Sequence, residues 1–216
     1  KLVTDTTLIE IASLKKKTVP ALKKTPKELQ TVSIHPMFGP DTIDLHEKTI
    51  ITIPVKNLVF EEKVTKSLFP EANHIVLNMD THDRYMSLIL ALPYFINMVF
   101  LKCLPFEDIG LIKKLAGPTF RTQYALAECI LGEDPEFVRS LIEDNVFVRD
   151  NLNDFVYEFK YLRRLLKNRP TDLGDYFLGI KNSIGFTNGF EKSRRIRNCF
   201  LEYVSLFRNM KGKEHE

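Results

Sequence analysis

A change in hydrophobic pattern near residue 80 constrains the fold of this chain more than any other feature. Before it, short β-branched runs alternate with helical segments, and after it only helical spacing is found. Strands that alternate with helices favour an α/β sheet, and a series of helices favours an all-α region. We therefore expect the C-terminal half of a doubly wound, Rossmann-like sheet over residues 1–79, a helical domain over 80–210 and a polar tail over 211–216.

The expected elements follow from apolar runs bounded by proline, asparagine or charged residues. Strands are predicted at residues 2–5, 32–34, 48–55 and 74–77, and helices at 7–17 and 58–68. Asp80 or Thr81 is expected to cap a long helix that reaches residue 103 and kinks at Pro93. Further helices are predicted at 106–115, 119–131, 135–145, 149–168, 172–184 and 190–209.

The composition argues against several classes of protein. A hydrophobic fraction of 44% and a net charge of +3 are typical of a soluble protein and give little support for nucleic-acid binding. Residues 85–101 carry no charge but contain Pro93 and Asn97, so we expect a buried core or interface helix rather than a membrane span. The three cysteines form no CxxC motif, which predicts buried reduced thiols in a cytoplasmic protein and no metal site.

His35 is the first candidate for chemistry. It ends a predicted strand, and Pro36 and Pro40 stiffen the turn that follows. Ligands of open α/β sheets bind beyond the carboxyl ends of strands, and an imidazole whose pKa lies near neutrality is a suitable general base. A structural role for this histidine is the alternative.

Arg121 is the second candidate, because it follows the Gly117-Pro118 break at the start of an otherwise apolar helix. Its guanidinium suits bidentate binding of a carboxylate or an internal salt bridge. His82 and Asp83 open the long apolar helix, where Asp83 would cap the helix or the pair would belong to a site. The sequence contains no glycine-rich phosphate loop and no pair of histidines at metal-ligand spacing.

These candidates lie in three segments that resemble the prephenate/arogenate dehydrogenase family of tyrosine and aromatic amino acid biosynthesis. Residues 34–41 match the family's HPMFGP signature, residues 82–95 resemble its HD-x-x-M segment with the following AL-x-HF, and residues 117–121 resemble its S-P-x-[YF]-R. The order and spacing of the three segments agree with the family. The resemblance implies a helical domain like the C-terminal domain of 6-phosphogluconate dehydrogenase.

The resemblance implies oxidative decarboxylation of prephenate to 4-hydroxyphenylpyruvate, with hydride transfer to NAD or NADP. It assigns the base to His35 and a substrate-carboxylate contact to Arg121. Thr7 aligns with the serine of a family D-x-x-S segment near the substrate hydroxyl and the nicotinamide, and Asp41 aligns with a residue at the pocket mouth. His82 is expected to orient the base or to line the pocket.

The resemblance also assigns weaker positions. Tyr94 stands where many members carry a second histidine and is expected to contact the substrate, and Ile9 stands where a lysine often follows the D-x-x-S segment. Pro36 and Met37 are expected beside the cofactor. The family's glycine-rich half is absent from this sequence, so we expect roughly 80–100 upstream residues to complete the nucleotide-binding domain.

The resemblance implies a homodimer formed through the helical domain, with residues 85–101 buried in part against a second subunit. A small-molecule substrate is expected, and neither nucleic acid nor a membrane. Two alternatives remain open. One is an arogenate-specific dehydrogenase, and the other is a non-catalytic dimerisation or aromatic-acid-sensing module of the same fold.

Overall fold

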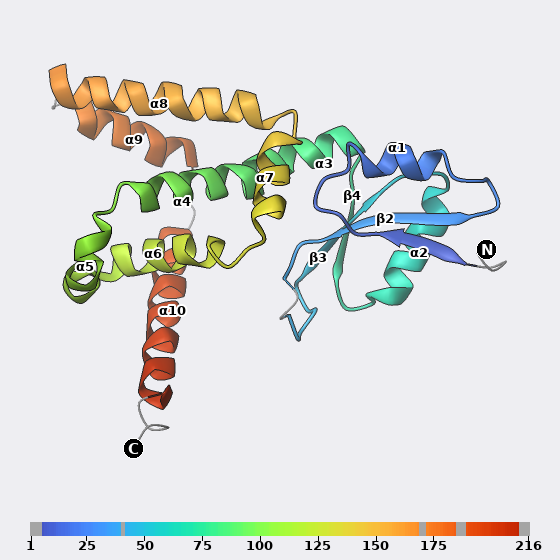
Figure 1. The fold of residues 1–216 in the computed structure, drawn as a ribbon, viewed down its shortest axis with the longest axis horizontal. Coiled ribbons are helices and arrows are strands. Elements are labelled where there is room, and N and C mark those ends of the chain that lie inside the picture. The colour runs from blue at the N-terminus through green and yellow to red at the C-terminus, as the bar shows by residue number, and fades with distance from the viewer. Residues whose placement is uncertain (1–5, 40–41, 169–171, 185–188, 212–216) are drawn as a thin grey trace. The chain divides into compact units, whose positions relative to one another are not determined.

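The computed structural model describes residues 6–39, 42–168, 172–184 and 189–211 (Figure 1). Its contacts divide the chain into two compact units, each built from two segments. The first unit contains Lys1–Pro93 and Pro135–Asn151, and the second contains Tyr94–Asp134 and Leu152–Glu216. The domain division after residue 79 stays a prediction, and the strand expected at 2–5 and the tail at 212–216 lie outside the described residues.

The first unit is built on a four-stranded mixed sheet whose strands follow chain order. Its elements are β1 (Thr7–Glu10), α1 (Thr18–Lys23), β2 (Gln30–Pro36), β3 (Thr49–Ile53), α2 (Leu58–Leu68), β4 (Asn73–Val76), α3 (Met79–Met86), the π-helix η1 (Ser87–Ala91) and α7 (Pro135–Glu143). β1 and β2 are parallel, as are β3 and β4, whereas β2 and β3 are antiparallel. A sheet followed by helices confirms the predicted fold class. The antiparallel pair departs from a doubly wound sheet because no crossover helix joins β2 to β3.

Side-chain alternation along the strands produces two apolar layers. Figure 1 shows α1 and α2 on opposite faces of the sheet. One layer contains Val32, Ile34, Ile50 and Ala72, and the other contains Val19, Ile51, Ile53 and Met86. Because successive strand residues point to opposite faces, His35 lies on the face opposite Ile34, which is the face covered by α1 and α3.

The helix predicted at residues 7–17 is wrong. Residues 7–10 form β1, and residues 11–17 form a loop that leads into α1. The run from Thr6 to Ile11 is rich in β-branched residues, and pairing with residues 30–33 of β2 satisfies its backbone groups. That tertiary pairing outweighs the weak helical spacing of the segment.

The long helix expected from residue 80 is confirmed as a continuous helical segment, Met79–Lys102. Its N-cap is Asn78 rather than Asp80 or Thr81, and the Asn78 side chain accepts a hydrogen bond of 2.8 Å from the backbone of Thr81. By length and composition this segment could cross a membrane, and the described residues contain one such helix. Only 22% of its most apolar window is buried within the chain, so the single chain does not bury this segment as a core helix.

The expected kink at Pro93 takes the form of a π-helical turn. Ser87–Ala91 directly precedes the proline, and the backbone N–H of Leu92 bonds to the carbonyl of Ser87, five residues earlier. A proline in an α-helix lacks an N–H and its ring clashes with the carbonyl four residues before it. The wider π turn relieves this conflict without ending the helix.

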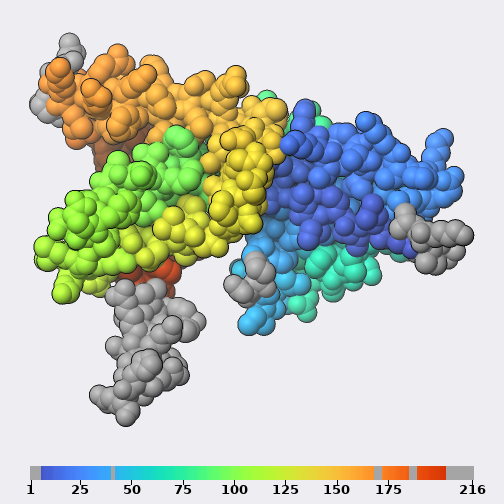
Figure 2. Space-filling model, in the orientation of Figure 1, coloured from blue at the N-terminus to red at the C-terminus, as the bar shows by residue number. Residues whose placement is uncertain are grey.

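The second unit is helical and has little apolar core of its own. Its elements are α4 (Leu92–Lys102), the 3-10 turn η2 (Phe106–Asp108), α5 (Ile109–Leu115), α6 (Pro118–Ile130), α8 (Val148–Asn168), α9 (Asp172–Ile184) and α10 (Gly189–Lys211). Ring contacts join α4 to α6 through Phe100 and Phe120, and α4 to α8 through Phe95 and Phe155. In the space-filling view, atoms of α4 and α5, drawn in green, lie at the surface (Figure 2).

The cysteine prediction is wrong for the single chain. All three thiols are free, and each is exposed on its helix: Cys103, Cys129 and Cys199. Helical spacing shows that a residue shares a face with apolar neighbours, but not whether the chain covers that face. The helical part of the chain also exposes several large apolar side chains, among them Leu131, Phe177 and Ile196.

Glu61 anchors the turn between β3 and α2 and generates a stability prediction. Its buried carboxylate accepts hydrogen bonds of 2.7–3.0 Å from the amides of residues 55–57. Glu61→Ala should lower the free energy of unfolding by about 3 kcal/mol in urea denaturation, since each unsatisfied buried amide costs about 1–3 kcal/mol. Glu62→Ala, which removes only a pair with Lys66, is the control and should cost under about 0.5 kcal/mol. Equal effects of the two substitutions would contradict this role.

Candidate functional site

His35 begins a hydrogen-bonded chain of side chains at the carboxyl end of β2. Its side chain is 6% exposed, and its neighbour across the antiparallel pair is Ile51. Nδ1 of His35 lies 2.9 Å from Nε2 of His82, and Nδ1 of His82 lies 2.8 Å from Oδ1 of Asp83. Two sequence candidates, separated by 47 positions, are therefore in direct contact and end on a buried carboxylate.

Asp83 is held by the loop that precedes α1. Its carboxylate accepts hydrogen bonds from the backbone N–H groups of Lys15, at 3.0 and 3.2 Å, and Lys16, at 2.9 Å. Its backbone carbonyl accepts a bond of 2.7 Å from the side-chain amide of Asn145. The carboxylate is thus an acceptor from donors on a loop and on α3, which fixes the end of the chain.

The carboxylate determines the tautomers of both rings. Because Oδ1 of Asp83 accepts, Nδ1 of His82 carries its hydrogen and the neutral ring offers Nε2 as an acceptor. Nδ1 of His35 must then donate to it, which leaves Nε2 of His35 with a lone pair. Within the described part of the chain this nitrogen has no hydrogen-bond partner, so it is the basic atom of the site.

The surroundings of His35 keep it neutral. The pKa of His35 is lowered from 6.5 to about 3, mainly by burial and then by His82 and Lys15, while Asp83 acts in the opposite direction. This is well below the near-neutral value expected from the sequence. A base must start in its unprotonated form. The imidazole therefore meets that requirement across the physiological range of pH.

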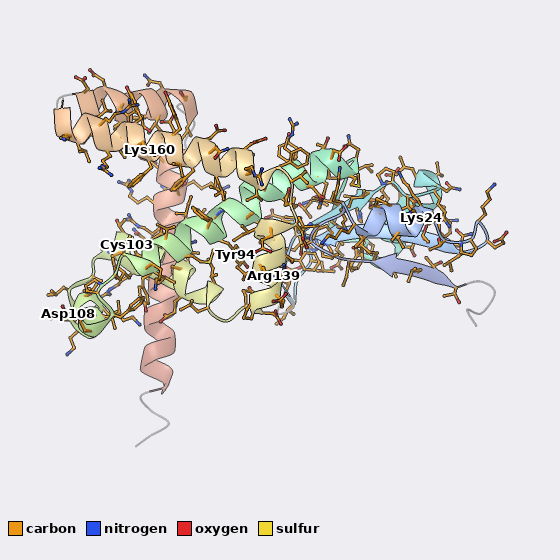
Figure 3. The ribbon with its side chains drawn as sticks, turned by 45° about the horizontal axis from the view of Figure 1, so that its top comes forward. Lys24, Tyr94, Cys103, Asp108, Arg139 and Lys160 are labelled. Carbon is orange, nitrogen blue, oxygen red and sulfur yellow. The ribbon has the colours of Figure 1, made fainter. Side chains whose placement is uncertain are left out.

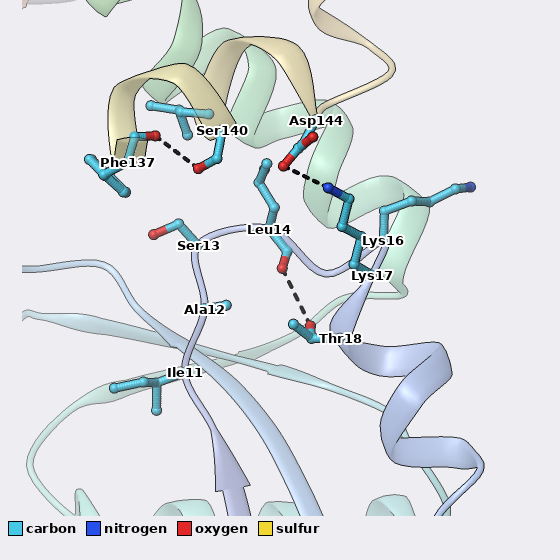
Figure 4. Close-up of a pocket in the computed structure, with 11 residues that line it drawn as sticks. Ile11, Ala12, Ser13, Leu14, Lys16, Lys17, Thr18, Phe137, Ser140 and Asp144 are labelled. Carbon is cyan, nitrogen blue, oxygen red and sulfur yellow. Dashed lines mark hydrogen bonds and ion pairs between the residues drawn. The ribbon is translucent and has the colours of Figure 1, made fainter. Parts of the chain in front are cut away.

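A pocket of about 350 Å³ lies at the carboxyl end of β1 (Figure 4), and His35 is not among the residues that line it. The loop 11–18 forms one wall and α7 the other, and Lys17 pairs with Asp144 at 2.8 Å across it. The loop that lines the pocket is also the loop whose amides bind Asp83. Pocket and base therefore share one structural support, at the sheet edge where ligands of α/β proteins bind.

The structure does not bring Thr7 to the base. Thr7 begins β1 and lies opposite Gln30 at the amino end of β2, whereas His35 lies at the other end of that strand. Because β1 ends at Glu10, the residues that follow its carboxyl end are those of the loop 11–17, and Thr7 is not among them.

A serine and a lysine stand six residues after Thr7 and Ile9, the positions to which the resemblance assigned the family's serine and lysine. Ser13 lines the pocket and Lys15 is fully buried, and both follow Glu10 at the spacing of the family's D-x-x-S segment and its lysine. The end of the β-branched run was the signal that could have found them. Asp83 and Asn145 had no comparable signal as partners, because they lie 62 positions apart.

The remaining candidates of the first unit have no assigned contact to a ligand. Pro36 ends β2, and Met37 packs partly buried against the layer that contains Ile51 and Met86. Asp41 lies outside the described residues. A cofactor contact of Pro36 and Met37 stays a prediction.

Arg121 and Tyr94 belong to the second unit. Arg121 is exposed in the first turn of α6, and no carboxylate of the described residues forms an ion pair with it. Tyr94 projects from α4 (Figure 3), and its hydroxyl donates to Oε1 of Glu133 at 3.3 Å. Burial and then Glu133 raise the pKa of Tyr94, so it is a neutral donor. Substrate contacts of both residues stay predictions.

An exposed group of Asp44, His46 and Glu71 has potential ligand atoms within 4.8 Å of one another. All three side chains are more than half exposed. Exposed acidic groups often lie together without a metal ion, and no buried donor supports this group. It is therefore not assigned as a metal centre.

Comparisons with known proteins point to one family. Residues 78–179 match the family described as "Prephenate dehydrogenase, dimerization domain", and a comparison with curated proteins found no significant match. A prephenate dehydrogenase from A. aeolicus, solved with hydroxyphenyl propionate and NAD+, has a TM-score of 0.60 and 20% identity over 83% of this chain and 66% of its own. Synechocystis arogenate dehydrogenase has a TM-score of 0.62 and 19% identity over 81% of this chain and 66% of its own. A putative prephenate dehydrogenase from Corynebacterium glutamicum has a TM-score of 0.61 and 16% identity over 83% of this chain and 62% of its own.

The fold of this chain is that of prephenate and arogenate dehydrogenases. Its residues 78–179 match the prephenate dehydrogenase dimerization-domain family, which confirms the resemblance drawn from the sequence. The chain spans 66% of the A. aeolicus and Synechocystis proteins. At identities of 16–20%, these comparisons show the fold but do not identify the substrate.

The buried base makes stability depend on pH. The pKa of His35 is about 3 in the folded protein and about 6.5 when unfolded, so between these values only the unfolded chain binds the proton. The free energy of unfolding should fall by about 2 kcal/mol from pH 7 to pH 5. In urea denaturation, His35→Asn should reduce this difference and the exposed control His46→Asn should retain it. An unchanged pH dependence in His35→Asn would contradict the buried, neutral state.

Proposed function

We propose that this chain supplies the catalytic base, the substrate-binding helices and the dimer interface of a prephenate dehydrogenase in tyrosine biosynthesis. The observation that carries the proposal is the chain from His35 through His82 to Asp83, with a free lone pair at its outer end. A cytoplasmic location follows from the same assignment. His35 is only 6% exposed, so a bound substrate would meet only an edge of its ring.

The proposed reaction is the oxidative decarboxylation of prephenate to 4-hydroxyphenylpyruvate. Nε2 of His35 removes the proton of the ring hydroxyl, while a hydride leaves the ring carbon that bears this hydroxyl. Loss of carbon dioxide then makes the ring aromatic. As His35 becomes positive, its Nδ1 hydrogen shifts along the 2.9 Å contact toward His82, beside the Asp83 carboxylate. The charge that burial disfavours is thereby stabilised by a preorganised anion.

NAD or NADP is the proposed hydride acceptor, and when bound it would take the hydride from the ring carbon. The pocket at the carboxyl end of β1, with Ser13 in its wall, suits the nicotinamide end of such a cofactor. The sequence has no glycine-rich turn for the phosphates and no assigned ribose-binding acid. This chain therefore supplies the proton chemistry, and the fit of its residues to a cofactor is limited to the pocket.

His82 has both ring nitrogens engaged and no exposure, so its proposed role is to orient His35 rather than to contact the substrate. Ser13 takes the place of Thr7 as the proposed hydroxyl near the reacting carbon. Arg121, which forms no ion pair with the residues that the structure describes, is proposed to bind a substrate carboxylate through its planar guanidinium.

Arogenate is a second candidate substrate, and Tyr94 is the observation that favours it. The Tyr94 hydroxyl is bonded to Glu133, and an anionic carboxylate beside a predicted substrate contact suits an ammonium group better than a keto group. Assaying both substrates under the same conditions decides between them.

Substitution of the base tests the proposal in the protein that carries this chain. His35→Asn should lower kcat by roughly 100- to 10,000-fold, the range of a general base, with little change in KM. His46→Asn is the matched control and should retain wild-type turnover. If the wild type binds 4-hydroxyphenylpyruvate in calorimetry but converts neither prephenate nor arogenate, the chain is a non-catalytic aromatic-acid-binding module.

A homodimer is proposed from the match to a dimerization domain and from the uncovered apolar side chains of the Met79–Lys102 segment, among them Ile89 and Val99. Light scattering should give about twice the 25.1 kDa chain mass. Val99→Lys should raise the monomer fraction, because a charge at an apolar interface is costly. A stable wild-type monomer would contradict the proposal.

A further inference from the structure

Lys15 is a charged side chain that the proposed reaction does not use and that is nevertheless fully buried. Its ammonium donates to the backbone carbonyl of Ile34 at 2.7 Å and to Oε2 of Glu10 at 2.9 Å. Ser33 donates to the same Glu10 oxygen at 2.6 Å. A lysine is rarely buried without such partners, because its charge must leave water.

The position of Lys15 links it to the base at two points. Its side chain binds the carbonyl of Ile34, the residue directly before His35, and its backbone N–H binds the Asp83 carboxylate at the other end of the chain. One residue therefore holds both the strand end that carries the base and the carboxylate that orients it.

The charged groups around His35 come from three elements. α3 contributes His82 and Asp83, the loop 11–17 contributes Lys15, and β1 contributes Glu10, which reaches the site only through Lys15. The neighbour from β3 is the apolar Ile51. Lys15 is thus the fixed positive group near the imidazole, opposite in sign to Asp83.

We propose that Lys15 is a positioning residue of the base: its buried ammonium, held by Glu10 and the Ile34 carbonyl, fixes the end of β2 and opposes protonation of His35 from behind. The inference rests on the proposed role of His35. The direction agrees with the lowering of the pKa of His35 by Lys15. Burial lowers the pKa of Lys15 itself, and Glu10 acts against that change.

The test compares Lys15→Met with Lys24→Met, an exposed lysine at the end of α1 that is labelled in Figure 3. The double variant Glu10→Gln/Lys15→Met removes both charges of the ion pair, so that no lone buried carboxylate remains if the single variant fails to fold. NMR titration of the histidine rings is carried out on the chain without substrate. His35→Asn identifies the His35 signals.

In both Lys15 variants the His35 pKa should rise by roughly one unit, because a nearby positive charge is lost. The ring nitrogen shifts should also change from the single Nδ1–H form to a mixture of tautomers, which a purely structural lysine would not cause. Lys24→Met should behave as wild type. In the pH profile of kcat/KM, the acidic limb should move to higher pH by the same amount.

A His35 pKa within about 0.2 unit of wild type in the folded double variant, with an unchanged tautomer, would overturn the inference. The two proposals can fail separately. Shifted titration in a protein without dehydrogenase activity would retain the role of Lys15 and refute the reaction. Dehydrogenase activity with an unshifted titration would retain the reaction and refute the role of Lys15.

Discussion

The Asp83 carboxylate is the group on which the arrangement of the first unit depends. It is 2% exposed, and it joins the loop before α1 to the start of the long helix by bonds to two backbone amides and one imidazole. A buried carboxylate is tolerated only when its oxygens are hydrogen-bonded. The loop, the helix and the strand end at His35 must therefore form together, and none of the three could shift without leaving a buried charge or donor unpaired.

Strand alternation converts this anchor into a site. Val32 and Ile34 face α2, so Ser33 and His35 must face α3 and the loop 11–17. That face carries a group of polar contacts: Ser33 donates to Glu10, and Lys15 bonds to both Glu10 and the Ile34 carbonyl. A shift of one residue in the pairing of β1 and β2 would exchange this polar face for the apolar one.

Much of the fold could be predicted because local signals were strong. α2 and α9 begin and end where periodicity and flanking residues placed them, since Asn57 caps α2 and a proline follows it. The segment 7–17 was assigned wrongly because its pairing partner, residues 30–33, lies outside any local window. The exposed cysteines were missed for a related reason: periodicity identifies a helix face, but only packing determines whether that face is covered.

Local patterns in the sequence were enough to identify two candidate site segments, a histidine in a stiff turn at a strand end and a His-Asp pair at a helix start. They were also enough to indicate the family. Their local residue types dictate a turn, a helix and a titratable ring wherever they occur. The tertiary structure was needed to show that His35 and His82 are in contact, that Asp83 orients both rings and that Lys15 lies behind the base. These are contacts between residues up to 68 positions apart, and they exist because burying a charge forces distant donors and acceptors to meet, which no local pattern records.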